Sequence, residues 1–194
     1  MRHTPRANRW CLTNSHELQR APVAARSWIG WPDSLTERIG ARLDGAVRIR
    51  VLSERIDRLM IDEREHLGSI ARSARIREVQ LEVRDQPVVL ARTVFADSTA
   101  RVMNHALRRL GTRSLGSLLF GALRAPVRTR EFTQLSTQSA LWRVMAAHLP
   151  ADVHSPWARR ALHLLQGHPL LVTEIFLPRL FAMALQAQQN GSSG

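Results

Sequence analysis

Glu174 is the residue of this sequence that most clearly needs a chemical explanation. It lies in residues 167–178, which otherwise read as a strand that is apolar on both faces. Side chains alternate between the two faces of a strand, so Glu174 shares its face with Val172 and Phe176. An isolated buried carboxylate is too costly to keep. We therefore expect Glu174 to be paired with a cation, protonated or used in chemistry.

Arg77 is the matching cation in a second strand-like segment, residues 76–84, where it shares the odd-numbered face with valines and a leucine. The even-numbered face carries Glu78 and Glu82, and its polar pattern predicts that it is exposed to water. Arg92 is a third charged residue within an apolar strand. These groups could form a structural salt bridge. Alternatively, they could bind a substrate carboxylate and handle a proton or hydroxyl group.

The composition predicts one domain in the cytoplasm. With 44% hydrophobic and 23% charged residues over 194 positions, the chain can bury one sizeable core. No apolar run approaches the ~20 residues of a membrane-spanning helix. Cys11 is the sole cysteine and is typical of a reducing compartment. No separate apolar helix face is left over in the pattern, so we expect a monomer.

The net charge of +12 favours an anionic partner, and residues 98–194 contain 11 arginines but only three acids. The arginines are scattered singly, aromatic residues make up 5% of the chain, and there is no tyrosine. Base-stacking platforms need interleaved aromatic side chains, so no nucleic-acid partner is expected. A small anionic molecule is the better interpretation.

Several common kinds of catalytic site are missing from the sequence. It has no phosphate-binding loop, dinucleotide fingerprint or nucleophile elbow. The eight histidines are dispersed, which argues against a metal site. We expect His105 and His163 to lie at the surface or at an edge.

Residue periodicity predicts helices and strands joined by hairpins rather than crossovers. Ser34 and Glu37 form a capping box that begins a helix, and the short apolar run 114–120 predicts one or two helical turns. The other predicted helices are 98–110 and 138–148, and the predicted strands are 47–59, 75–83, 87–95, 127–135 and 170–177. Residues 157–165 fit either a helix or a strand.

This order indicates an α+β fold, a single domain with a largely antiparallel sheet and helices packed against it. Residues 1–26 look irregular. We place the domain at residues 1–180 and expect the polar, Gly/Ser-rich tail, residues 181–194, to be disordered.

Ten segments, in order along almost the whole chain, resemble the chorismate lyase (chorismate–pyruvate lyase) family. The most specific is the block Gly-x-Pro-Leu-Leu-x-Thr-Glu that ends at Glu174. The matching segments are 9–11, 33–36, 77–79, 91–94, 110–111, 114–116, 119–120, 129–132, 157–160 and 167–178.

The resemblance implies a twisted antiparallel sheet with surrounding helices and flap segments over a buried pocket. It also implies a lyase that eliminates pyruvate from chorismate to give 4-hydroxybenzoate for ubiquinone synthesis, with neither metal nor cofactor. The family's substrate contacts fall on Leu35, Arg77, Leu115 and Glu174, and we add Arg92 as a supporting candidate. Arg77 would bind a substrate carboxylate, and Glu174 would bind the ring hydroxyl. The ring proton would move either within the substrate or through Glu174.

The sequence departs from the pattern of the family at two places, and a second, rival function is compatible with the same fold. Residues 143–156 look like an insertion that could reshape a lid, and Leu35 stands where the family often has methionine, a mild change in volume. The rival is a non-catalytic ligand-binding domain, because effector domains of bacterial transcription regulators resemble this fold. Such regulators carry an N-terminal winged helix-turn-helix, for which residues 1–33 are too short.

Overall fold

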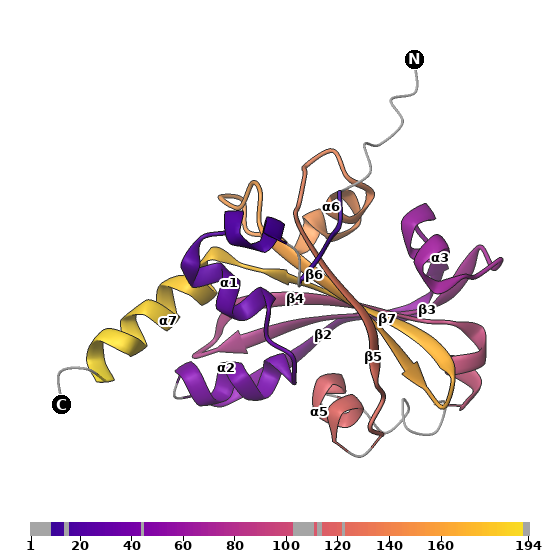
Figure 1. Ribbon diagram of the computed structural model, residues 1–194, viewed down its shortest axis with the longest axis horizontal. Helices are drawn as coiled ribbons and strands as arrows, with labels where there is room; N and C mark the ends of the chain where they lie inside the picture. Colours follow the sequence, from indigo (N-terminus) through magenta and orange to yellow (C-terminus); the bar gives the residue numbers. More distant parts are fainter. Residues whose placement is uncertain are drawn as a thin grey trace.

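The computed structural model describes residues 9–13, 16–43, 45–102, 111, 114–121 and 123–191. Its centre is one seven-stranded sheet in the order β1-β5-β6-β7-β4-β3-β2, in which all neighbouring strands are antiparallel (Figure 1). The strands are β1 (Cys11–Leu12), β2 (Val47–Arg58), β3 (Ser73–Val83), β4 (Gln86–Phe95), β5 (Val127–Gln134), β6 (Trp157–Leu165) and β7 (His168–Phe176). The predicted α+β fold with an antiparallel sheet is therefore confirmed.

Helices cover both faces of this sheet (Figure 1). The helical elements are η1 (His16–Arg20), α1 (Val23–Ile29), α2 (Leu35–Leu43), α3 (Ile61–Leu67), α5 (Leu115–Phe120), α6 (Ala140–Met145), η2 (Ala146–His148) and α7 (Pro178–Gly191). Helices α1, α2 and α7 pack in one cluster on the face of the sheet that carries Arg77 and Glu174, which we call the cavity face. Helices α3 and α6 pack on the opposite face, which carries Arg92 and Arg160 and is called the far face.

Two tight turns set the register of the central strands. Arg84 and Asp85 join β3 to β4 with φ values of 49° and 59°, and Gln166 and Gly167 join β6 to β7 with φ values of 49° and 84°. Positive φ at both central residues is the mark of a type I′ turn, whose twist matches that of antiparallel strands. The two hairpins meet where β4 pairs with β7. Arg77 and Glu174 therefore come to one face from non-adjacent strands.

The structure differs from the sequence-based expectation at both ends of the chain. Residues 1–26 were expected to be irregular, but α1 begins at Val23, and its Trp28 and Ile29 are buried in the core. The tail from residue 181 was expected to be disordered, but α7 continues to Gly191. Its first two turns pack on the core through Leu180, Phe181 and Ala184. These apolar residues recur at helical spacing and pack on the core, so the segment is helical although most of the tail is polar.

The remaining differences concern the middle of the chain. Residues 157–165, which fit a helix or a strand, form β6, and α3 was not predicted. Residues 97–102 are helical as expected, whereas the rest of that predicted helix, 103–110, with His105, lies outside the described residues. Within the described ranges, no helix combines the length and apolarity needed to cross a membrane.

Candidate functional site

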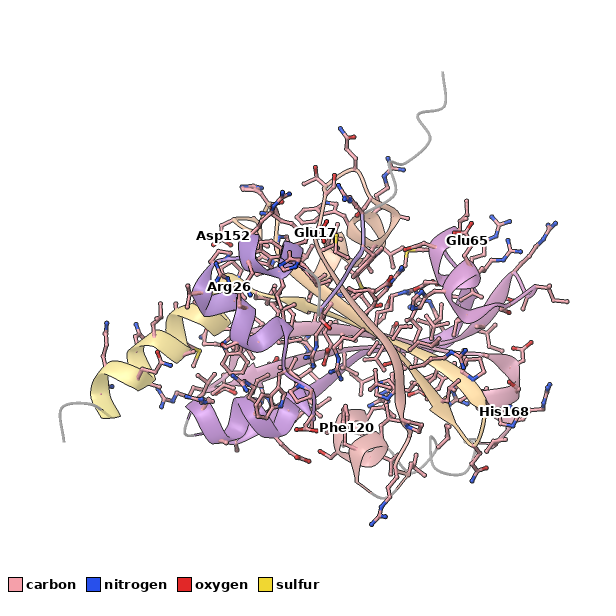
Figure 2. All side chains as sticks on the ribbon, in the orientation of Figure 1. Glu17, Arg26, Glu65, Phe120, Asp152 and His168 are labelled. Carbon is pink, nitrogen blue, oxygen red and sulfur yellow. The ribbon has the colours of Figure 1, made fainter. Side chains whose placement is uncertain are left out.

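A cavity of about 60 Å³ lies between the cavity face of the sheet and the helices α2 and α5. Leu35 lines it from α2, and Leu115 and Phe120 line it from α5. In Figure 2, Phe120 marks α5 on one side of the sheet and Glu65 marks α3 on the other. The side chains of Ser114 and Thr36 are joined by a hydrogen bond of 2.9 Å, which ties the start of α5 to α2. These two helices are the covering segments of the cavity.

The register of the sheet places the charged residues of the cavity face in two parallel rows. One row runs across five strands from Arg130 on β5 to Arg77 on β3, with small or medium side chains between them. The intervening residues are Ala161, Val172 and Thr93. The next row sets Arg159 opposite Glu174, and Glu174 opposite Ala91. Small residues on the central strands leave the space that the longer charged side chains surround.

Arg77 is 4% exposed and is held at the cavity wall by two contacts. Its Nη1 donates to Glu54 Oε2 at 2.6 Å, and its Nη2 donates to the carbonyl oxygen of Gly111. Burial disfavours the charge of Glu54, but hydrogen bonds from Arg75 and Arg77 outweigh burial and lower its pKa. The Arg77 guanidinium is thus fixed in position beside the cavity.

Glu174 is paired with Arg159, a residue that the sequence did not single out. Arg159 Nε donates to Glu174 Oε2, and its Nη1 donates to the carbonyl oxygens of Trp28 at 3.2 Å and Trp31 at 2.8 Å. The C-terminal end of a helix attracts cations, so the end of α1 is a favourable position for the Arg159 guanidinium. Among the described residues, no hydrogen bond is found to the other carboxylate oxygen, Oε1. Glu174 therefore has a fixed orientation and one oxygen left for a ligand.

The structure brings four of the five predicted site residues together. Leu35, Arg77, Leu115 and Glu174 all line the cavity. The two charged residues do not pair with each other, because Glu54 and Arg159 occupy the respective positions opposite them on adjacent strands.

Arg92, the fifth candidate, is not in the cavity. It lies on the far face, where its Nε donates to Glu63 Oε1 at 2.8 Å and its Nη1 to Glu78 Oε1 at 2.6 Å. Burial opposes the charge of Arg92, but the two carboxylates outweigh burial and raise its pKa. All three side chains are 2% exposed. Its role as a substrate contact was therefore wrongly predicted.

The far face of β3 is also not exposed to water as expected. Glu78 and Glu82 are 2% and 3% exposed. Ion pairs compensate for the burial of these two carboxylates, because Glu78 pairs with Arg92 and Glu82 pairs with Arg48. Helix α3 covers part of this face and supplies Glu63 to the same cluster. Buried carboxylates need such partners, and the partners come from segments distant in the sequence.

His163 and Arg130 also line the cavity, and neither was predicted as a site residue. His163 was expected at the surface, but it is 2% exposed. Its Nδ1 donates to the carbonyl oxygen of Ala125 at 3.2 Å, and its ring meets Phe120 edge-on at 5.5 Å between centroids. Burial lowers the pKa of His163, which keeps the imidazole neutral near pH 7. Side chains alternate between the two faces of a strand. This alternation shows that both residues face the cavity only once the pairing of β5 with β6 is known.

The cavity is small for an aromatic ring. An apolar cavity that holds benzene measures roughly 150 Å³, which is larger than the about 60 Å³ enclosed here. Outward movement of α2 or α5 would enlarge this space for a ring-sized ligand. The flap role of the segments that carry Leu35 and Leu115 stays a prediction.

In the part of the chain that the structure describes, no group of three or more His, Cys, Asp or Glu residues is placed to hold a metal ion. The ionic groups at the cavity are instead three arginines and one carboxylate: Arg77, Arg130, Arg159 and Glu174. Such a set suits an organic anion with a hydroxyl group.

Comparisons with known proteins give a consistent result. The sequence model of a family described as "Chorismate lyase" matches residues 6–186. A "Probable chorismate pyruvate-lyase" of Dechloromonas aromatica (strain RCB) is 41% identical over 158 residues, 80% of this chain and 87% of the relative. A protein of the same name from Pseudomonas aeruginosa PAO1 is 36% identical, over 87% of this chain and 91% of the relative.

Solved structures are similar in fold at low sequence identity. The ligand-binding domain of a protein assigned to the GntR family of transcriptional regulators, from Bordetella bronchiseptica, has a TM-score of 0.51 and 15% identity. The match covers 69% of this chain and 86% of that domain. A Staphylococcus aureus protein gives a TM-score of 0.50 at 11% identity, over 77% of this chain and 90% of that protein. At such identities the likeness shows the fold alone.

Proposed function

Because the chain belongs to the chorismate lyase family, we propose that it eliminates pyruvate from chorismate and releases 4-hydroxybenzoate, the first step towards ubiquinone. The observation that carries the proposal is the covered cavity, which is lined by both the buried Arg77 and the half-buried Glu174. This space is bounded by small apolar residues and by further arginines. A dicarboxylate with a ring hydroxyl group matches that pattern of charge.

The reaction needs little chemistry from the protein. The carbon–oxygen bond of the enolpyruvyl ether breaks, the ring loses one proton, and the pyruvate carbon skeleton gains one at its methyl carbon. Formation of the aromatic ring drives the elimination. The enzyme must mainly hold the side chain in line for the bond to break, which is a positioning task. No cofactor is required by this chemistry.

Arg77 binds a substrate carboxylate in this proposal. Its guanidinium is already oriented by Glu54 and the Gly111 carbonyl, so little freedom is lost when the substrate binds. A charged hydrogen bond is also stronger in a site from which water is excluded. Leu35 and Leu115 exclude water by covering the ring.

Glu174 binds the ring hydroxyl and relays the proton in this proposal. Oε2 is held by Arg159, which leaves Oε1 to accept a hydrogen bond from the substrate hydroxyl. A carboxylate in this position can take the proton that leaves the ring and return it to the leaving group. Arg159 would offset the negative charge before and after each transfer.

We also propose that the chain acts as a monomer in the cytoplasm, without a nucleic-acid partner. Residues of one chain line the cavity, and Cys11 is free. Several arginines that contribute to the charge of +12 are buried in ion pairs, among them Arg77, Arg92 and Arg159. Light scattering of the purified chain measures its oligomeric state.

The test is to incubate the purified protein with chorismate and to follow both products, 4-hydroxybenzoate and pyruvate. The wild type should release them in equal amounts, and Arg77→Ala should lose turnover while its circular dichroism spectrum remains that of the wild type. A wild type that binds chorismate and leaves it unchanged would instead support the non-catalytic ligand-binding function.

A further inference from the structure

Arg130 is the least satisfied of the three arginines that line the cavity. Arg77 is bound to Glu54 and the Gly111 carbonyl, and Arg159 is bound to Glu174 and the end of α1. Within the described residues, Arg130 has one side-chain hydrogen bond, from Nη2 to the carbonyl oxygen of Pro32 at 2.7 Å.

The Nε atom of Arg130 is buried and has no hydrogen-bond partner among the described residues. Arginine carries five N–H donors, and a buried donor without a partner is costly. No carboxylate of the described residues lies within ion-pair distance of this guanidinium. Burial and the positive charge of Arg159 lower the pKa of Arg130, and the negative charges of Glu174 and Asp33 offset this only in part. Such a cation would be stabilised by an anion.

The position of Arg130 in the sheet indicates the shape of that anion. Arg130 and Arg77 stand at the two ends of one row of the cavity face, with Ala161, Val172 and Thr93 between them. Four strand spacings separate their Cα atoms, about 19 Å. Both side chains line the same cavity, so they approach it from opposite ends. A molecule with a carboxylate at each end can meet both guanidinium groups.

We propose that Arg130 binds the second carboxylate of the substrate, that of the enolpyruvyl side chain, while Arg77 holds the carboxylate on the ring. This role of Arg130 rests on the proposed lyase function. It gives the enolpyruvyl side chain, which leaves as pyruvate, a binding residue of its own. Arg130 takes the role for which the sequence suggested Arg92. The product 4-hydroxybenzoate has only the ring carboxylate, so Arg130 distinguishes substrate from product.

The experiment uses the full-length wild type and four variants, Arg130→Met, Arg130→Lys, Arg77→Met and Arg128→Met. It compares the KM of chorismate with the Kd of 4-hydroxybenzoate, which calorimetry measures. Arg130→Met should raise the KM about tenfold to hundredfold, the range of one hydrogen-bonded ionic contact, and leave the Kd of 4-hydroxybenzoate unchanged. Arg77→Met should weaken both. Arg128→Met is the matched control, because it removes the same charge from an exposed position of β5. It should change neither constant.

Two results would overturn the assignment of Arg130. One is an unchanged KM in Arg130→Met. The other is a Kd of 4-hydroxybenzoate that weakens by the same factor as the KM, since Arg130 would then contact the ring carboxylate or only shape the cavity. Recovery of part of the affinity in Arg130→Lys would support a charge contact. A wild type without turnover would overturn the lyase function itself, which is a separate outcome.

Discussion

The carboxylate of Glu174 is held by the guanidinium of Arg159, its direct neighbour across β6 and β7. Arg77, which lies two strands away from β7, is held by Glu54 instead. These two opposite charges of the cavity are therefore each paired with a side chain of the protein itself. This arrangement fixes the orientation of both groups beside an apolar space.

Replacing Glu174 by glutamine should lower kcat by about hundredfold or more, the usual range for the loss of a general acid–base group. The amide keeps the shape of the side chain and can still accept a hydrogen bond from Arg159, but it cannot take a proton. Release of pyruvate measures the effect. Glu82→Gln is the control, because Glu82 is a buried carboxylate of the far face, paired with Arg48. Equal losses in the two variants would exclude a specific role of Glu174.

Arg159 and Arg160 are adjacent in the sequence but point to opposite faces of β6. Arg159→Met should lower the free energy of unfolding by about 3 kcal/mol, because it leaves Glu174 unpaired in a largely buried position. It should also reduce kcat, because Glu174 loses its orientation. Arg160→Met should destabilise the fold less, since its partners Glu131 and Asp62 are 18% and 32% exposed. Urea unfolding and steady-state kinetics separate the two effects.

We expect kcat to fall in Arg159→Met and to keep its wild-type value in Arg160→Met. If both variants keep the wild-type kcat, Arg159 contributes to stability alone. If both lose activity to the same degree, the far face is coupled to the cavity.

His163 should make the fold sensitive to mild acid. Burial lowers its pKa in the folded state, so the unfolded chain takes up the proton first as the pH falls below about 6.5. Stability is therefore fully present above that pH and declines below it. His163→Gln should reduce this decline without abolishing it, because the pKa of His66 is also lowered, by burial and then by Arg160. Thermal unfolding between pH 8 and pH 5.5 measures the difference; identical pH profiles would contradict this role.

The hydrogen bond between Ser114 and Thr36 should slow release of the product. Thr36→Val removes the acceptor at nearly constant volume, and the loss of one hydrogen bond, about 1 kcal/mol, corresponds to roughly fivefold faster dissociation. Ser114 is less suitable for this test because its side chain also caps α5 by accepting from the Ser117 amide. Stopped-flow displacement of 4-hydroxybenzoate measures the rate. Inhibition by added product should weaken in parallel, and an unchanged rate would show that another contact holds the flaps closed.

Alternation along the strands was sufficient to identify two of the charged cavity residues. Arg77 and Glu174 each interrupt a row of apolar residues on one face of a strand, and each faces the cavity as predicted. Alternation shows which residues share a face, but it does not show what covers the second face. The carboxylates Glu78 and Glu82 looked exposed for that reason, although arginines from other strands neutralise them within the fold.

Arg130 and Arg159 could not be predicted in the same way. Residues 157–165 begin with a tryptophan, an alanine and two arginines, which fit a helix or a strand equally well. Only the pairing of β6 with β7 places Arg159 opposite Glu174. Arg92 was misplaced for a related reason, since a buried arginine in an apolar strand can lie on either face.

The anchoring of Arg159 by the carbonyl oxygens of Trp28 and Trp31 spans 131 and 128 residues of sequence. The orientation of the Glu174 carboxylate consequently depends on contact between the early and late parts of the polypeptide. A chain in which these two parts have not yet met leaves Arg159, and with it the Glu174 carboxylate, without this anchor.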